Sequence, residues 1–221
     1  MRSSALSLVV LACCLSVGVA SASSISFTGT FITDDQLEVF QFTALTPSFT
    51  AQTLSYAGGT NANGTVIPAG GFDPFLSLFD ATGGLVTTND DNPAATVDPS
   101  TTFAFDSLLT VGTLTPGDTY RLVLSENDNV PVDSSYADGF TQTGNPTFTA
   151  TEFGCPGGGP GPFCDEGMNQ RNGKWAVDLI GVSSASDISG GAAPEPGSIL
   201  LLSAGLASLA LLRRRRKQKQ V

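Results

Sequence analysis

Hydrophobic and polar residues alternate in short runs through most of this chain, which is the pattern of β-strands with one buried face. Gly, Pro, Asn and Asp gather between the runs, as is typical of tight turns. Such alternation predicts antiparallel sheets that pack in pairs, so we expect an all-β fold, an antiparallel β-sandwich or jelly roll of about nine strands. The predicted strands are Ile25–Phe31, Glu38–Thr43, Phe49–Tyr56, Phe75–Phe79, Leu85–Thr88, Thr101–Phe105, Thr119–Ser125, Thr147–Thr151 and Lys174–Val182.

Large apolar side chains occupy every second position in three of these predicted strands, so in each strand they share one face. We assign these faces, and most of the 14 phenylalanines of the chain, to the core rather than to a ligand-binding surface. The side chains are Phe40 with Phe42, Tyr120 with Leu122 and Leu124, and Trp175 with Val177 and Leu179.

The N-terminal end has the pattern of a secretory signal peptide. Arg2 precedes an apolar stretch from Ala5 to Val19, and the small residues of Ala20-Ser21-Ala22 form a cleavage site. We therefore predict a helical signal peptide over residues 1–22 and a mature chain that begins at Ser23.

The C-terminal end combines three features in order. Pro194-Glu195-Pro196 precedes an apolar run, Gly197–Leu212, and the basic residues Arg213, Arg214, Arg215, Arg216 and Lys217 follow. At about 1.5 Å per residue the run reaches only about 24 Å, less than the ~30 Å hydrocarbon core, so we predict a short transmembrane helix that anchors the chain temporarily. Basic residues stay on the cytoplasmic side, which places the preceding domain across the membrane.

This tail resembles the PEP-CTERM sorting signal of Gram-negative bacteria. The resemblance implies recognition by an exosortase, a membrane-embedded processing enzyme, in species that make exopolysaccharide. An ordinary tail anchor that happens to contain Pro-Glu-Pro is the alternative interpretation. The predicted organisation is a signal peptide (1–22), an exported β-sandwich domain (23–184), a linker (185–193) and the sorting signal (194–221).

Within the exported domain, residues 34–128 are similar to bacterial pre-peptidase C-terminal (PPC-type) β-sandwich modules. Three stretches carry the resemblance: 34–44, 72–91 and 114–129. The resemblance implies a non-catalytic accessory domain, of a kind in which some members bind calcium or assist polymer binding.

The charge and the composition of the chain exclude several classes of function. From Ser23 to Ala193 the chain has 19 acidic residues against three basic ones, a net charge of −16. Such a surface repels nucleic acids and anionic lipid head groups, so nucleic-acid binding is excluded, whereas divalent cations suit it. The chain contains no histidine, which removes Ser-His-Asp and Cys-His catalysis and the common zinc sites. We expect no catalytic residues and no enzymatic activity.

Two cysteines, Cys155 and Cys164, remain after removal of the signal peptide and enclose a loop rich in Gly and Pro. A pair in an exported chain predicts a disulfide bond. We expect this loop to be peripheral to the sandwich. A two-thiol metal site is the alternative, although no histidine and no further cysteine of the mature chain could complete it.

Acidic and amide side chains gather at two predicted turns. The first corner is Asn89-Asp90-Asp91, with Asp73 and Asp80 flanking the preceding hairpin, and the second is Glu126-Asn127-Asp128. Calcium requires six to eight oxygen ligands, which such turns can provide. We therefore take Asp73, Asp80, Asn89, Asp90 and Asp91 as a possible calcium site in a protein that otherwise needs no cofactor. The alternative is that these side chains only cap β-turns.

These observations predict a non-enzymatic exported surface or extracellular-matrix protein, associated with exopolysaccharide or biofilm. It would reside transiently in the inner membrane and then in the cell envelope, at the cell surface or in the matrix. The alternative is a calcium- or carbohydrate-binding β-sandwich module at the cell surface.

Overall fold

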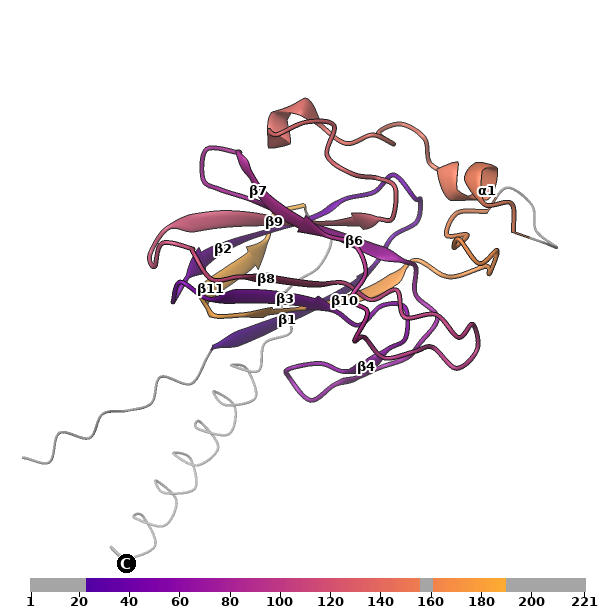
Figure 1. Cartoon of the computed structure of the whole chain (residues 1–221), viewed down its shortest axis with the longest axis horizontal. Coiled ribbons are helices and arrows are strands. Elements are labelled where there is room, and N and C mark those ends of the chain that lie inside the picture. The colour runs from indigo at the N-terminus through magenta and orange to yellow at the C-terminus, as the bar shows by residue number, and fades with distance from the viewer. Residues whose placement is uncertain (1–22, 156–160, 190–221) are drawn as a thin grey trace, which may run out of the picture.

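The computed structural model describes residues 23–155 and 161–189, and the predicted signal peptide, membrane helix and sorting signal lie outside those residues. The described part is mostly β, with antiparallel sheets (Figure 1). Its strands are β1 (Ser24–Thr30), β2 (Glu38–Ala44), β3 (Phe49–Thr53), β4 (Gly59–Thr60), β5 (Val66–Ile67), β6 (Pro74–Phe79), β7 (Leu85–Asn89), β8 (Leu108–Val111), β9 (Thr119–Glu126), β10 (Lys174–Ile180) and β11 (Val182–Asp187). One sheet has the order β1-β10-β3-β8, a second has β11-β2-β9-β6-β7, and β4 pairs with β5.

The two large sheets pack face to face around one hydrophobic core, in agreement with the predicted sandwich (Figure 1). Aromatic pairs bridge them: the rings of Phe27 in β1 and Phe40 in β2 lie 4.7 Å apart, and those of Phe42 in β2 and Phe49 in β3 lie 4.3 Å apart. The three alternating faces predicted from the sequence all enter this core. Alternation identified these positions because a half-buried strand turns every second side chain inward.

The outer face of the five-stranded sheet is also covered, which the alternation did not predict. All six residues of β6 are buried. A second, smaller cluster contains Val39, Phe79, Val123 and Phe140, and the segment that follows β9 supplies Phe140 and the adjoining Tyr136. The excursion after β9 therefore shields a face that we expected to be solvated.

Two predicted strands are wrong. Residues 101–105 form a loop in which Thr102 has φ 69°, and the strand of this region is β8, which begins at Leu108. Residues 148–152 form the helix α1 (Phe148–Glu152), and a 3-10 turn, η1 (Tyr136–Asp138), precedes it. Both segments have the residue types of strands but make other hydrogen bonds. The N–H groups of Thr101 and Thr102 donate to the Asp98 carbonyl, and the buried carboxylate of Asp34 accepts from the Thr149 N–H and hydroxyl.

The C-terminal strand continues into the segment predicted to be a linker. β11 pairs with β2 as far as Asp187, and the Ile188 N–H donates to the Val39 carbonyl at 2.9 Å. Within residues 23–155 and 161–189, no helix has the length and apolar character needed to cross a membrane.

Glu38 lies at the start of β2, beside the end of β11, and its side chain is buried. Burial, followed by the hydrogen bond and the charge of Asp187, raises the pKa of Glu38 from 4.5 to about 7, while the Ser189 hydroxyl lowers it in part. The folded protein therefore holds this proton more tightly than the unfolded chain does. The resulting stabilisation is complete below pH 4.5 and is lost as the pH rises to about 7.

We expect Glu38→Gln to remove this loss, because glutamine stays neutral at every pH. Solvent near the strand end screens part of the effect. When the pH rises from 5 to 8, the free energy of unfolding of the variant should therefore increase by about 1–2 kcal/mol relative to that of the wild type. Chemical denaturation at both pH values in the presence of a chelator measures the difference. Asp118→Asn removes one exposed charge and is the control, and an equal gain in both variants would assign the effect to net charge.

Candidate functional site

Three strand ends meet at one end of the five-stranded sheet and carry acidic side chains. Asp73 immediately precedes β6, while Asp90 and Asp91 immediately follow β7. Since β6 and β7 are antiparallel, with Leu76 opposite Asn89, the start of one strand lies beside the end of the other. Glu126, the last residue of β9, pairs with Pro74 at the start of β6. We call Asp73, Asp90, Asp91 and Glu126 the acidic corner.

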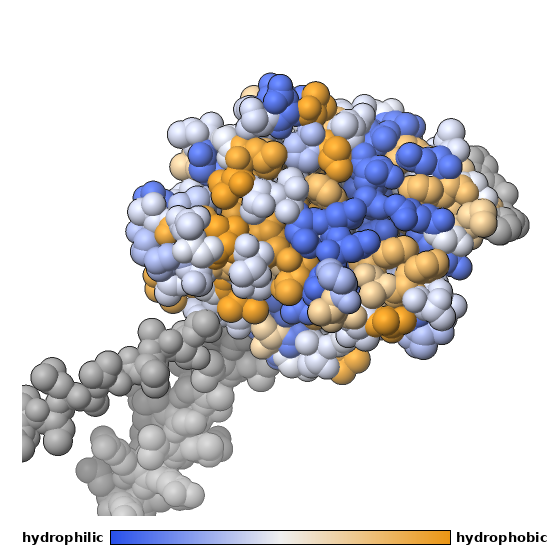
Figure 2. Space-filling view, in the orientation of Figure 1, coloured by the Kyte–Doolittle hydropathy of each residue, from blue (hydrophilic) through white to orange (hydrophobic). Residues whose placement is uncertain are grey.

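Three carboxylates of the acidic corner lie close enough to share one ion. Asp73, Asp90 and Asp91 each offer an oxygen, and these atoms all lie within 4.8 Å of one another. Two oxygens bound to one calcium at 2.3–2.6 Å are at most about 5 Å apart. Asp73 is buried, whereas Asp90 and Asp91 are exposed, so the group is open to solvent on one side. In Figure 2 hydrophilic residues gather over the region where Figure 1 labels β6 and β10.

The structure does not bring the other two predicted ligands into the corner. Asp80 follows the opposite end of β6, and its carboxylate accepts hydrogen bonds from Thr82 and from the Gly84 N–H within its own turn. Asn89 directs its side-chain oxygen to the Leu108 N–H at 2.7 Å. Both are corrections to the predicted site: Asp80 caps a turn, and Asn89 ties β7 to β8 of the other sheet.

The acidic corner holds carboxylate oxygens that lack partners. In the described part of the chain, Asp73 Oδ1 and Glu126 Oε2 are buried without a hydrogen bond. Burial, followed by the charges of Asp91 and Asp90, raises the pKa of Asp73 well above its usual value. Burial, followed by the charge of Asp73, does the same for Glu126. Loss of surrounding water, then the charge of Asp90, raises the pKa of Asp91 to about 6.

Most other buried carboxylates of the described residues have hydrogen-bond partners; the exception is Glu38, whose Oε1 is also unpaired. Asp106 accepts from the backbone N–H groups of Ser55, Tyr56 and Ala57 and from the Thr53 hydroxyl. Further buried acids with partners are Asp34, Asp98, Asp165 and Asp178. No ion pair balances the negative charge of the acidic corner among the described residues. The ion pair found there joins Arg171 to Asp98, which lies outside the corner.

The second acidic turn, Glu126-Asn127-Asp128, also faces the site, although the sequence did not assign it there. Its Asn127 side-chain nitrogen lies 3.5 Å from an oxygen of Asp73 and 3.5 Å from an oxygen of Glu166. Glu166 was missed because it lies beyond the second cysteine, 93 positions after Asp73 in the numbering. Nothing in the local sequence marks it as part of the corner.

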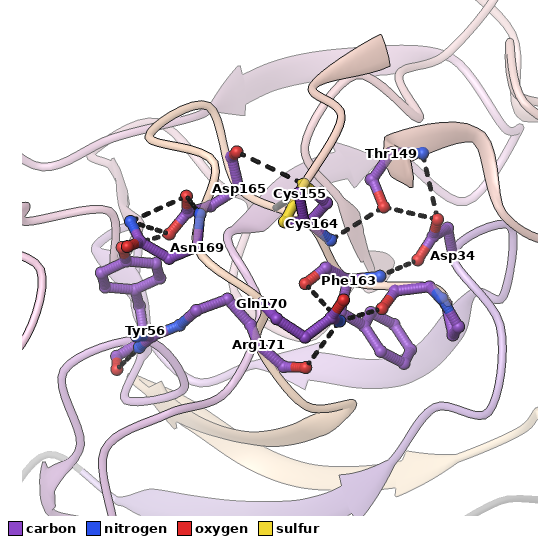
Figure 3. The surroundings of a disulfide bond; sticks show 11 residues. Asp34, Tyr56, Thr149, Cys155, Phe163, Cys164, Asp165, Asn169, Gln170 and Arg171 are labelled. Carbon is purple, nitrogen blue, oxygen red and sulfur yellow. Dashed lines mark hydrogen bonds between the residues drawn. A yellow bond between two sulfur atoms is a disulfide. The ribbon is translucent and has the colours of Figure 1, made fainter. Parts of the chain in front are cut away.

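The predicted disulfide between Cys155 and Cys164 is confirmed (Figure 3). Contrary to expectation, its second half belongs to the core. Cys164 has no exposed surface, and the ring of the neighbouring Phe163 stacks on Phe72 with centroids 5.6 Å apart. Asp34 accepts a hydrogen bond from the Phe163 N–H at 2.5 Å and so holds the start of this segment against the end of the sandwich.

Hydrogen bonds also fix the residues that follow the disulfide (Figure 3). Asp165 accepts from the Tyr56 hydroxyl at 2.6 Å and from the Asn169 N–H at 2.8 Å. The Arg171 guanidinium lies 3.9 Å from the centre of the Tyr56 ring. Glu166 therefore extends from a rigid turn toward the acidic corner.

The tail of the chain matches a known family. Residues 192–217 match the PEP-CTERM protein-sorting motif, in agreement with the resemblance of Pro194, Glu195, Pro196 and the basic block. The chain therefore carries a sorting signal for an exosortase-type processing enzyme, which indicates export and sorting at the membrane. No curated protein matches the chain. The similarity of residues 34–128 to PPC-type modules stays a prediction.

Proposed function

We propose that this chain is a non-enzymatic exported protein of the cell surface or extracellular matrix of a Gram-negative bacterium, associated with exopolysaccharide or biofilm. The observation that carries the proposal is the match of residues 192–217 to the sorting motif. The exported domain adds a strongly acidic surface, a disulfide suited to an oxidising compartment, and a sequence without histidine.

The sorting proposal predicts loss of both ends of the chain. Intact-mass measurement of envelope and matrix fractions should show a product that begins near Ser23 and ends near Pro194–Pro196, because the signal peptide and the tail are both removed. Arg213, Arg214, Arg215 and Arg216 dominate the topological signal, so replacing all four with glutamate should disturb orientation and reduce the processed product several-fold.

The control replaces the same four residues with lysine, which keeps the charge. Equal processing of the glutamate and lysine variants would contradict the role of charge in orientation. Recovery of the intact basic tail in cells that contain an exosortase would contradict processing altogether. Co-sedimentation of the processed product with purified exopolysaccharide tests the association separately from sorting.

A second candidate function is a calcium- or carbohydrate-binding module at the cell surface. The convergence of Asp73, Asp90 and Asp91 at one sheet end favours a cation over a carbohydrate as the primary ligand. Co-sedimentation with exopolysaccharide, with and without calcium, tests whether a cation contributes to polymer binding. Equal sedimentation in both conditions would remove the calcium-dependent form of this candidate.

A further inference from the structure

The acidic corner contains more negative charge than its protein partners balance. Asp73 is 2% exposed, and in the described part of the chain its Oδ1 atom has no hydrogen-bond partner. Its nearest donor there is the Asn127 amide nitrogen, 3.5 Å from Oδ2. Leaving a buried carboxylate oxygen unpaired is costly, so a buried acid normally has a donor or a cation beside it.

Turn capping, the alternative interpretation of these residues, does not account for the corner. It does account for Asp80, whose oxygen accepts three hydrogen bonds within its own turn. Among the described residues, no hydrogen bond to the carboxylates of Asp90 or Asp91 occurs, although both directly follow a strand. Each instead offers an oxygen that lies within 4.8 Å of an oxygen of the Asp73 carboxylate.

The backbone beneath these side chains is held in place. The Ser107 hydroxyl lies 2.7 Å from the Pro74 carbonyl and 3.2 Å from the Asn89 carbonyl, and it also contacts the Asp90 carbonyl. The Asn127 N–H donates to the Asp73 carbonyl at 2.9 Å. These contacts fix the ends of β6, β7 and β9 relative to one another, so the carboxylates meet on a rigid frame.

We propose that Asp73, Asp90 and Asp91 are the carboxylate ligands of a calcium ion. Carboxylate oxygens are the ligands that hard divalent cations prefer, and calcium tolerates the irregular geometry and the remaining water ligands of a site open on one side. Glu126 is a further buried acid of the corner, and the charge of the ion would stabilise its carboxylate. The site does not depend on sorting, and only its use in polymer binding rests on the second candidate function.

Glu166 makes the ion a link between the sandwich and the disulfide segment. Its carboxylate lies 3.5 Å from the Asn127 amide, which also faces Asp73. Because Glu166 and Asp73 both face this amide, an ion at the corner reduces the repulsion between their negative charges and holds the segment after Cys164 against the ends of β6 and β7.

The test uses the processed exported protein, freed of metal with a chelator and dialysed. Calorimetric titration with CaCl2 and thermal unfolding over a range of calcium concentrations give the affinity and the stabilisation, with NaCl at matched ionic strength as the salt control. The wild-type unfolding midpoint should rise with calcium, because the ion binds the native state alone. A midpoint that stays flat up to 10 mM calcium, with no heat of binding, would overturn the site without affecting the sorting proposal.

Variants locate the ion. Asp90→Asn and Asp91→Asn should each weaken calcium binding at least about tenfold, because affinity follows the number of charged ligands. Both residues are exposed, so the fold should survive. Asp118→Asn, the same change at an exposed site near the opposite strand ends, should bind calcium as the wild type does. An equal loss in Asp118→Asn and Asp90→Asn would show general charge screening and overturn the proposal.

Discussion

Replacing Phe40 with alanine is expected to lower the free energy of unfolding by about 3–5 kcal/mol. The Phe40 ring has no exposed surface and lies between the sheets, 4.7 Å from the Phe27 ring and 5.8 Å, edge-on, from the Trp175 ring. The substitution removes contacts with both sheets and leaves a cavity that a rigid β-framework cannot close. Urea denaturation monitored by the fluorescence of Trp175 measures the loss.

Phe103→Ala is the matched control. Phe103 is 37% exposed and stacks on Phe105, so its removal should cost less than about 1 kcal/mol. Equal losses in the two variants would contradict the assignment of Phe40 to the central core. Domains of this size are stable by only about 5–15 kcal/mol, so the Phe40 variant should also reach the envelope in lower yield.

Removal of the disulfide is the second large effect that we expect. Closing a loop of this length restricts the unfolded chain by about 2–3 kcal/mol, so Cys155→Ser with Cys164→Ala should lower the unfolding midpoint by roughly 5–10 °C. Because Phe163 and Cys164 are buried, the effect should extend to the end of the core. Thermal unfolding monitored by circular dichroism gives the midpoint.

Reduction of the wild type with dithiothreitol should reproduce the midpoint of the double variant, and the same reagent should leave the variant unchanged. Calcium binding should also weaken after reduction, since Glu166 follows Cys164 by two positions. Free thiols in the native exported protein, or an unchanged midpoint after reduction, would contradict a structural role for the bond.

The acidic corner shows how far the sequence could predict a site. Asp90 and Asp91 were recognisable because two adjacent acids follow a strand, and Asp73 because it precedes the other strand of the same hairpin. Asp80 is also an acid that directly adjoins β6. It lies at the other end of that strand, however, and caps a turn. Local pattern does not separate these cases, because an acid that caps a turn and an acid that binds an ion occur in the same kind of turn.

The predictions of strands at 101–105 and 147–151 were wrong for a related reason. Their Thr and Phe residues favour strands, but a strand also needs the edge of a neighbouring strand to pair with. In the tertiary structure these segments make hydrogen bonds to other groups instead. Thr149, for example, is held by the buried carboxylate of Asp34. The β-strand propensity of a segment predicts its structure poorly where hydrogen bonds to distant residues can replace those of a sheet.

The sequence by itself determined the class of fold, the disulfide and the sorting signal, because each depends on a pattern that is contiguous or on a pair of cysteines with no competitors between residues 23 and 193. Only the tertiary structure decided which acids meet. Asp73, Asp90, Glu126 and Glu166 come from four separate segments, and their convergence depends on the order β9-β6-β7 in the sheet and on the disulfide segment packed beside it. Strand order results from packing across the whole core, and no short stretch of the chain encodes it.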